Sequence, residues 1–355
     1  MKRVSIIGHF GFGFKYLDGQ TIKTKIVSDE LQRQLGQDQV QRFDTHGGWK
    51  LLLKAPFQVF HALNRSSNVL IFPAHNGLRV YAPLLAFLKR FFKNRKIHYV
   101  VIGGWLPQFI QNRLFLVKSL KKYDGIYVET NTMKNALQAQ GFENIFVMPN
   151  CKELDILSVD ELVYQISEPY KLCTFSRVMK EKGIEDAVDA VKAINVAAGR
   201  TVYMLDIYGP VDSDQAKWFE QLQVGFPDYV KYKGVVDSNQ SVDVLKNYFA
   251  LLFPTRFYTE GIPGTVIDAY AAGIPVISSR WESFSDVIDQ DITGFGYTFG
   301  SQSELINLLF SIAENPQIVL ELKSACLEKA KEFTPETVVN ILTRGGYKNI
   351  TFTIK

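Results

Sequence analysis

The sequence of 355 residues has few cysteines and no long apolar run. Its three cysteines, Cys151, Cys173 and Cys326, are far apart and form no CxxC or Cys/His pattern, which argues against disulfides and a zinc site. The opening run MKRVSIIGHFGFGF is short and glycine-broken, and no stretch approaches the roughly 18 apolar residues of a membrane span. We therefore expect a cytoplasmic protein that is neither secreted nor integral to a membrane.

Acidic residues are absent from residues 45–123, a stretch that holds 13 lysines and arginines. Residues 1–165 contain 22 basic and 12 acidic residues, whereas residues 166–355 contain 18 and 24. Within the acid-free stretch, LLAFLKRFFKNRKIH at residues 84–98 repeats apolar residues at three and four positions, which predicts an amphipathic helix with a basic rim. Such a helix is either an ordinary surface helix or one that lies on an anionic membrane, and the missing acids favour the membrane. Its phenylalanines do not resemble stacking platforms for bases, so we expect no nucleic-acid partner.

Strand-like runs alternate with helical stretches along the chain. Runs rich in β-branched and aromatic residues, such as residues 68–75 and 250–255, are separated by helical patterns such as residues 184–199 and 241–250. This alternation predicts α/β structure with parallel sheets covered by helices on both faces. Because the chain is long enough for two cores, we expect two doubly wound, Rossmann-like domains at residues 1–165 and 166–335, followed by a C-terminal segment at residues 336–355.

A glycine-rich loop follows the first predicted strand. Gly8, Gly11 and Gly13 permit backbone conformations and close approaches that side chains would forbid. Their spacing is not the GxGxxG of dinucleotide-binding proteins, which disfavours a dehydrogenase. The loop is either a flexible surface turn or, with the following DGQT as a helix cap, a site for an anion at the carboxyl edge of the sheet.

Two cations follow the first predicted strand of the second half, in FSRVMKEKG. Arg177 stands at the end of the strand, and Lys182 precedes Gly183 at the start of a helix. Fixed positive charge and free helix amides both favour a diphosphate. A solvated charge cluster would give the same pattern.

A loop with a lone acid follows the predicted strand at residues 250–255. Gly261, Pro263 and Gly264 predict a tight turn whose amides, with that of Thr265, begin a helix and can face phosphate oxygens. Glu260 lies in this loop, and an aspartate, Asp268, follows about two turns into the helix. The two carboxylates could accept hydrogen bonds from the hydroxyl groups of a sugar and of a ribose.

In this order, these segments resemble the family-four retaining glycosyltransferases of GT-B fold, of the bacterial capsule and exopolysaccharide type. The family signature of a glutamate, seven residues and a second glutamate matches Glu260 to Asp268. The family's Arg and Lys pair matches Arg177 and Lys182. The resemblance covers residues 170–300, and in the first half it is limited to the architecture and the glycine loop.

The resemblance implies two domains with an interdomain cleft, a UDP- or GDP-sugar as donor, and neither a metal nor a cofactor. Arg177 and Lys182 would neutralise the leaving diphosphate, Glu260 would orient the transferred sugar, and Asp268 would hold the ribose. The acceptor would be a saccharide bound by the N-terminal domain, presented on undecaprenyl diphosphate at the inner membrane surface, and the C-terminal segment could cross back to that domain. The catalytic residues implied are Glu260, Arg177 and Lys182, and His75 is a further catalytic candidate. The donor-binding residues implied are Gly11, Gly13, Arg177, Lys182, Gly209, Val235, Glu260, Gly261, Ile262, Pro263, Gly264, Thr265 and Asp268.

The sequence also departs from the family pattern. The second acid is the shorter Asp268, and the strand on which many relatives carry a histidine continues here into Gly103, Gly104 and Trp105. His75, or with less support His9, could take the place of that histidine, and either could instead be structural. The DQD at residues 289–291 mimics a metal-binding motif, but we expect a surface turn there. A non-catalytic partner subunit, or another sugar-nucleotide enzyme of the same fold such as a phosphorylase or an epimerase, remains an alternative to a transferase.

Overall fold

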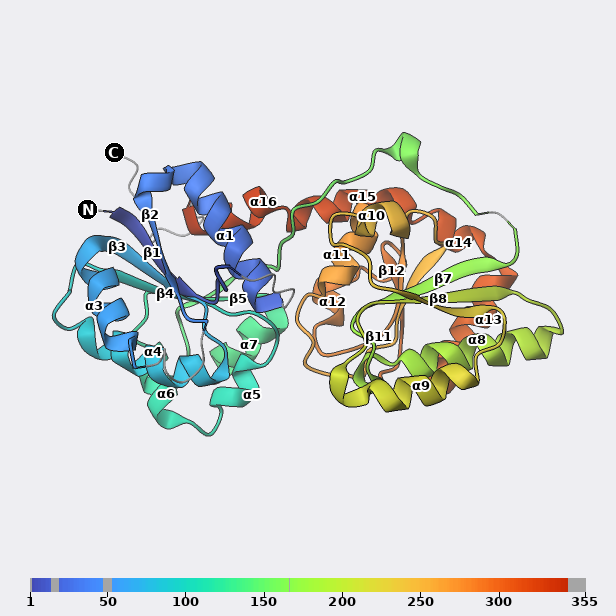
Figure 1. The fold of residues 1–355 in the computed structure, drawn as a ribbon, viewed down its shortest axis with the longest axis horizontal. Helices are drawn as coiled ribbons and strands as arrows, with labels where there is room; N and C mark the ends of the chain where they lie inside the picture. The colour runs from blue at the N-terminus through green and yellow to red at the C-terminus, as the bar shows by residue number, and fades with distance from the viewer. Residues whose placement is uncertain (1, 14–18, 47–52, 166, 344–355) are drawn as a thin grey trace. The chain divides into compact units, whose positions relative to one another are not determined.

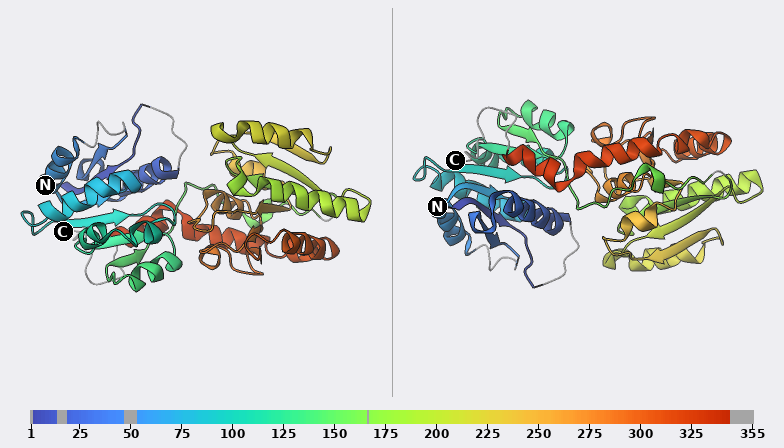
Figure 2. Two further views of the ribbon diagram at one scale, coloured as in Figure 1. Left: turned by 90° about the horizontal axis from the view of Figure 1, so that it is seen from below. Right: turned by 90° about the horizontal axis from the view of Figure 1, so that it is seen from above.

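The protein forms two α/β units, each with a parallel sheet between layers of helices (Figures 1 and 2). The structure is a computed structural model and describes residues 2–13, 19–46, 53–165 and 167–343. Unit 1 comprises Met1–Glu153 and Phe333–Lys355, and unit 2 comprises Leu154–Glu332. The sequence predicts domain limits at residues 165 and 335, whereas the structure divides the chain after residues 153 and 332. The expected DGQT cap begins at Asp18, which lies outside the described residues.

Unit 1 is built on a parallel sheet with the strand order β2-β1-β3-β4-β5-β6. Its strands are β1 (Lys2–Gly8), β2 (Val40–Asp44), β3 (Ser66–Ile71), β4 (Lys96–Val100), β5 (Gly125–Val128) and β6 (Ile145–Val147). Its helices are α1 (Gly19–Leu35), η1 (Gln37–Gln39), α3 (Ala55–Arg65), α4 (His75–Leu88), α5 (Leu106–Ile110), α6 (Leu114–Leu120), α7 (Asn131–Ala139) and α16 (Pro335–Thr343). The chain runs from β1 to one edge and then returns to β3 on the other side, so the order reverses between β1 and β3.

The two faces of this sheet carry separate hydrophobic layers. Helices α3 to α7 cover one face through residues such as Val59 and Leu85, and α1 and α16 cover the other through residues such as Val27 and Val338. Strand residues with alternating side-chain directions supply both layers, because successive side chains point to opposite faces. Burial on both faces explains why these strands read as nearly continuous apolar runs.

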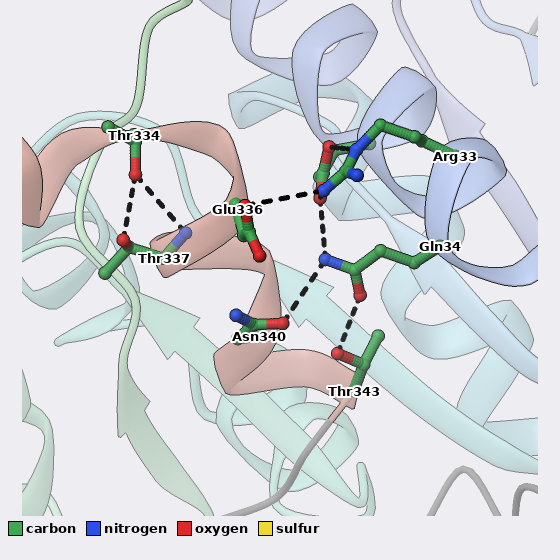
Figure 3. Close-up of polar contacts among 8 residues, drawn as sticks. Arg33, Gln34, Thr334, Glu336, Thr337, Asn340 and Thr343 are labelled. Carbon is green, nitrogen blue, oxygen red and sulfur yellow. Dashed lines mark hydrogen bonds and ion pairs between the residues drawn. The ribbon is translucent and has the colours of Figure 1, made fainter.

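The late helix α16 is joined to α1 by polar side chains at the rim of their apolar contact (Figure 3). The Gln34 side chain donates to Asn340 Oδ1 at 3.3 Å and accepts from the Thr343 hydroxyl at 2.9 Å. Arg33 lies 3.7 Å from Glu336. Residues about 300 positions apart in sequence therefore complete one layer of unit 1.

Unit 2 is built on a second parallel sheet, with the order β12-β11-β10-β7-β8-β9. Its strands are β7 (Tyr170–Phe175), β8 (Tyr203–Tyr208), β9 (Val230–Gly234), β10 (Ala250–Phe253), β11 (Val276–Ser279) and β12 (Gly294–Tyr297). Its α-helices are α8 (Ile184–Ala198), α9 (Ala216–Val224), α10 (Ser241–Leu245), α11 (Gly264–Ala271), α12 (Phe284–Val287), α13 (Gln302–Glu314), α14 (Gln317–Leu320) and α15 (Lys323–Ala330). The described residues after 153 also include the 3-10 turns η2 (Val159–Glu161), η3 (Lys180–Lys182), η4 (Ser213–Gln215) and η5 (Lys331–Phe333). The strand order reverses between β7 and β10, and the predicted doubly wound topology of both sheets is confirmed.

The predicted amphipathic helix at residues 84–98 is wrong. Helix α4 ends at Leu88, turns follow, and residues 96–100 form β4. The Asp124 carboxylate holds the end of this turn, because it accepts from the Ile97 backbone N–H at 2.7 Å and pairs with Lys89 at 2.6 Å. Apolar residues that repeat every three or four positions can therefore extend across a helix end, a turn and the start of a buried strand.

Candidate functional site

The candidate site in unit 2 lies where the order of its sheet reverses. In open parallel sheets, ligands bind outside the carboxyl ends of the strands at such a reversal. The loop after β7 carries Arg177 and Lys182, and the loop after β10 carries Glu260. Because β7 and β10 are hydrogen-bonded neighbours, these loops leave the same edge of the sheet side by side.

Lys182 and Glu260 form an ion pair across the two loops. Lys182 Nζ lies 2.8 Å from Glu260 Oε2, and the two side chains are 15% and 17% exposed. The Thr255 hydroxyl donates to the same carboxylate oxygen at 3.3 Å, and the ammonium group lies over the rings of Phe253 and Phe257. The pair is therefore positioned by several contacts and remains accessible to a ligand.

A close backbone approach holds these loops together. Gly183 has a φ of +68°, and a Cβ added there would lie 1.9 Å from the Pro254 carbonyl oxygen. The Arg256 backbone N–H donates to the Glu181 carbonyl at 2.8 Å, and the Arg256 side chain donates to Asp186 at 2.7 Å. Glycine at residue 183 is thus needed both for its backbone conformation and for the contact between the loops.

Arg177 is held by a different part of unit 2. Its side chain is 55% exposed, and Nη1 lies 3.6 Å from Asp212 Oδ2. Beside it, Gly209 has a φ of +128°, and a Cβ there would lie 1.9 Å from the Ser176 carbonyl oxygen. The Gly209 N–H donates to the Gly234 carbonyl at 2.9 Å. These contacts place the ends of β7, β8 and β9 together, next to the exposed Val235.

Helix α11 begins beside Glu260, as the sequence predicts. Pro263 is its N-cap residue, and Gly264 and Thr265 are its first residues. The first amides of a helix lack partners within the helix and carry partial positive charge, which favours an anion. The Thr265 hydroxyl oxygen is buried and has no hydrogen-bond partner among the described residues. Gly261 and Ile262, which lead into this turn, are buried as well.

Asp268 lies in α11 and is only 4% exposed. Glu260 is more accessible, at 17%. Asp289 and Asp291 of the DQD segment lie in a turn before β12, where Asp289 pairs with Lys329 at 3.2 Å. Throughout the described ranges, no three or more His, Cys, Asp and Glu side chains are grouped so as to hold a metal ion.

The remaining predicted residues, Gly11, Gly13 and His75, lie in unit 1 at the reversal between β1 and β3. Gly11 and Gly13 have positive φ angles of 56° and 87°. Asp44 accepts hydrogen bonds from the Phe10 and Phe12 backbone N–H groups at 2.9 and 3.1 Å. Burial raises the pKa of Asp44, but these and neighbouring N–H donors outweigh burial and hold the pKa below its ordinary value.

The two candidate histidines lie in different surroundings within unit 1. His9 is hydrogen-bonded to His46, and their rings are stacked with centroids 4.7 Å apart. His75 is the first residue of α4, and its ring lies 3.9 Å from that of Trp105. Burial, followed by the charges of Arg79 and Arg113, lowers the pKa of His75. A neutral imidazole at residue 75 is therefore favoured near pH 7.

Several residues of these sites could not be identified from motifs. Asp212 and Thr255 bind Arg177 and Glu260, and neither belongs to a spacing pattern. Gly183 and Gly209 can be noted in the sequence, but only the folded chain shows which backbone oxygens they approach. A short polar residue directly after a buried strand was the available signal for Thr255.

Known proteins are similar in sequence to parts of this chain. Residues 163–333 match the family described as glycosyl transferases group 1. An uncharacterized 41.2 kDa protein in the cps region of Klebsiella pneumoniae is 24% identical over 207 residues, which cover 58% of this chain and 51% of that protein. The amylovoran biosynthesis glycosyltransferase AmsK of Erwinia amylovora is 22% identical over 175 residues, 47% of this chain and 41% of that enzyme. The chain thus matches about half or less of the length of these relatives.

Solved structures resemble the chain over nearly its whole length. Anabaena Alr3699/HepE in complex with UDP has a TM-score of 0.71 at 16% identity, covering 96% of this chain and 98% of that one. The lipopolysaccharide outer core galactosyltransferase WaaB in its apo form has a TM-score of 0.70 at 17% identity, covering 95% and 97%. At such low identity the likeness shows the fold, which is the GT-B fold expected from the sequence.

Proposed function

Because residues 163–333 match the family described as glycosyl transferases group 1, we propose that the protein transfers a sugar from a nucleotide diphosphate sugar to a saccharide acceptor in surface polysaccharide synthesis. The observation that carries the proposal is the Lys182–Glu260 pair, 2.8 Å apart at the reversal of the unit 2 sheet and next to the start of α11. A cation, a carboxylate and free helix amides in one place suit a diphosphate joined to a sugar.

The diphosphate of the donor would lie between Lys182, Arg177 and the first turn of α11. As the bond to the sugar breaks, negative charge builds up on the leaving diphosphate, and fixed donors aimed at that charge supply the largest catalytic effect in many enzymes. The buried Thr265 hydroxyl, which lacks a partner among the described residues, would donate to a phosphate oxygen. On this account no metal ion is required.

Glu260 would orient the transferred sugar by accepting from its hydroxyl groups. A bound sugar must share or replace the contact of Glu260 with Lys182, so the hydroxyl groups of the sugar would exchange with the Lys182 ammonium group as partners of the carboxylate. Asp268 would hold the ribose, at a buried position about one turn along α11, not two turns as expected from the sequence. Transfer would retain the configuration of the sugar by a front-face route, in which the leaving phosphate helps to remove the acceptor proton.

The donor is proposed to be a UDP- or GDP-sugar, since a structural neighbour binds UDP. The test is a thermal-shift panel of uridine, guanosine and adenosine diphosphate sugars. A ligand at 100 times its dissociation constant stabilises the protein by about 2.7 kcal/mol. One donor should raise the melting temperature of the wild type and fail to do so for Arg177→Ala. A shift that survives Arg177→Ala would overturn the placement of the diphosphate.

We further propose that unit 1 binds the surface of the inner membrane, where a lipid-linked acceptor is presented. Its helices and turns expose phenylalanines, and the most exposed are Phe57, Phe91 and Phe115, at 81%, 71% and 70%. They belong to the stretch without acidic residues, so the charged side chains near them in sequence are all basic. Within the described ranges, none of the helices is sufficiently long and apolar to span a bilayer.

A further inference from the structure

Phe109 in unit 1 is contacted by two arginines, Arg79 and Arg113. The guanidinium carbon of Arg113 lies 4.2 Å from the centroid of the Phe109 ring, and that of Arg79 lies 5.3 Å from it. Arg113 also donates to the Phe109 carbonyl. Neither arginine forms an ion pair among the described residues, and the sequence has no Asp or Glu between residues 45 and 123.

The same ring joins this pair to His75. The His75 and Phe109 rings meet edge to face with centroids 4.8 Å apart, and the Trp105 ring packs against both. His75 and Arg79 are one helical turn apart on α4 and therefore share a face of that helix. This cluster, formed by His75, Arg79, Trp105, Phe109 and Arg113, follows the carboxyl ends of β3 and β4. It thus lies at the edge of the sheet where parallel folds bind ligands.

We propose that this cluster binds a phosphate-type anion on unit 1, separately from the donor diphosphate on unit 2. Two planar guanidinium groups present paired N–H donors that match phosphate oxygens. Stacking on Phe109 orders both groups in advance, which lowers the entropy lost on binding. The two guanidinium groups repel each other, and an anion bound between them offsets that repulsion.

On the proposed function, on which this identification rests, the anion is the diphosphate of a lipid-linked acceptor. The aromatic rings of Trp105 and Phe109 border the cluster and would contact the first apolar atoms of the lipid chain or the first sugar. Free inorganic diphosphate carries the same charged group but has neither a lipid chain nor a sugar attached. The two sources can therefore be separated by comparing inorganic pyrophosphate with farnesyl diphosphate.

The experiment counts pyrophosphate sites by calorimetry in four forms of the full chain. The wild type is expected to bind two, one on each unit. Arg79→Ala/Arg113→Ala and Arg177→Ala/Lys182→Ala are each expected to bind one, and the quadruple variant none. In the Arg177→Ala/Lys182→Ala background, farnesyl diphosphate is expected to bind at least tenfold more tightly than pyrophosphate if the site serves a lipid. Equal affinity would instead assign it to free diphosphate.

The outcomes separate this proposal from the donor site. If Arg79→Ala/Arg113→Ala still binds two pyrophosphate molecules, the cluster is not a phosphate site. If Arg177→Ala/Lys182→Ala still binds two, only the proposed donor site is refuted. The matched control, Arg3→Ala/Arg65→Ala, removes the same charge from unit 1 and should bind two. Arg79→Lys/Arg113→Lys keeps the charge but loses the planar donors, and it should bind between three- and thirtyfold more weakly at this site. Unchanged binding by the lysine variant would mean a diffuse charge effect.

Discussion

Lys182 Nζ and Glu260 Oε2 lie 2.8 Å apart, although the residues are 78 positions apart in sequence. They meet because β7 and β10 are adjacent in the sheet of unit 2, and because Gly183 lets its loop touch the Pro254 carbonyl. Without a ligand, each charge neutralises the other. A diphosphate sugar offers the ammonium group an anion and the carboxylate a set of hydroxyl groups, so binding exchanges one set of polar contacts for another.

Replacing Glu260 by Gln should therefore impair the chemical step more than donor binding. The amide keeps the shape and can still bind a hydroxyl, but it loses the charge that positions Lys182 and polarises the sugar. Loss of one such stabilising group typically lowers kcat by about 100- to 1000-fold. We expect this fall in the rate of donor hydrolysis or transfer, with a melting temperature close to that of the wild type.

The matched control for this variant is Glu168→Gln. Glu168 also forms an ion pair in unit 2, with Arg200 at 2.8 Å, but it precedes β7 at the opposite end of the strand. Its replacement should leave kcat within about twofold, because exposed ion pairs contribute only about 0–1 kcal/mol. Equal losses in the two variants would mean that the effect of Glu260→Gln is structural.

Gly183→Ala should destabilise unit 2 through a steric clash. Its Cβ would lie 1.9 Å from the Pro254 oxygen, so the β7 and β10 loops must separate. Gly199→Ala is the control, because Gly199 has a similar φ of +63° but nothing lies within 4 Å of the added Cβ. The left-handed conformation costs both variants about 1–2 kcal/mol, and the clash should cost Gly183→Ala about 1–3 kcal/mol more. Urea unfolding measures the difference, and equal stabilities would contradict the close contact.

The positions of the strands along the chain and the site loops could be predicted from sequence because both depend on local patterns. Apolar runs identified every strand except β12, whose four residues, GFGY, include two glycines that disfavour strands. Residue types and spacing made the Arg177, Lys182 and Glu260 loops candidates, and the family resemblance implied their roles. The contacts of Gly183 with Pro254 and of Arg177 with Asp212 could not be predicted, because they depend on how distant loops approach one another.

Membrane binding by unit 1 should depend on its exposed phenylalanines. Phe57→Ser/Phe91→Ser removes the two most exposed of them and should weaken binding to vesicles of phosphatidylglycerol at least tenfold, because a buried Phe contributes about 1.5–3 kcal/mol. Co-sedimentation measures the bound fraction. Phosphatidylcholine vesicles should bind little, since the basic side chains each contribute about 1 kcal/mol only at an anionic surface.

Two exposed valines of unit 2 provide the control for this experiment. Val196 and Val224 are 76% and 89% exposed and lie in α8 and α9. Val196→Ser/Val224→Ser should bind vesicles like the wild type. Vesicle binding that is equal in all three proteins, or absent in the wild type, would rule out insertion of the unit 1 phenylalanines.

A buried lysine should make the stability of unit 2 depend on pH above neutrality. Lys323 is 0% exposed, and among the described residues its ammonium group donates only a long hydrogen bond, 3.4 Å, to the Gly273 carbonyl. Burial lowers its pKa from 10.5 to about 8, against a smaller opposite effect of Cys326. Between these two values the unfolded chain binds more protons than the folded one, so this residue makes stability rise with pH over that window. Below pH 8 both states are protonated, and the full cost of burying the charge is present.

Lys323→Met should remove that cost while keeping a side chain of similar length. We expect the variant to be more stable than the wild type at pH 7, and its advantage to shrink as the pH rises from about 8 to about 10.5. Urea unfolding of both proteins at pH 7, 8.5 and 10 gives this difference directly, since other titrating groups cancel. Lys217→Met, at an exposed position of α9, should change stability little at each pH. An advantage of Lys323→Met that stays constant to pH 10 would show that the buried ammonium group does not lose its proton in the folded protein.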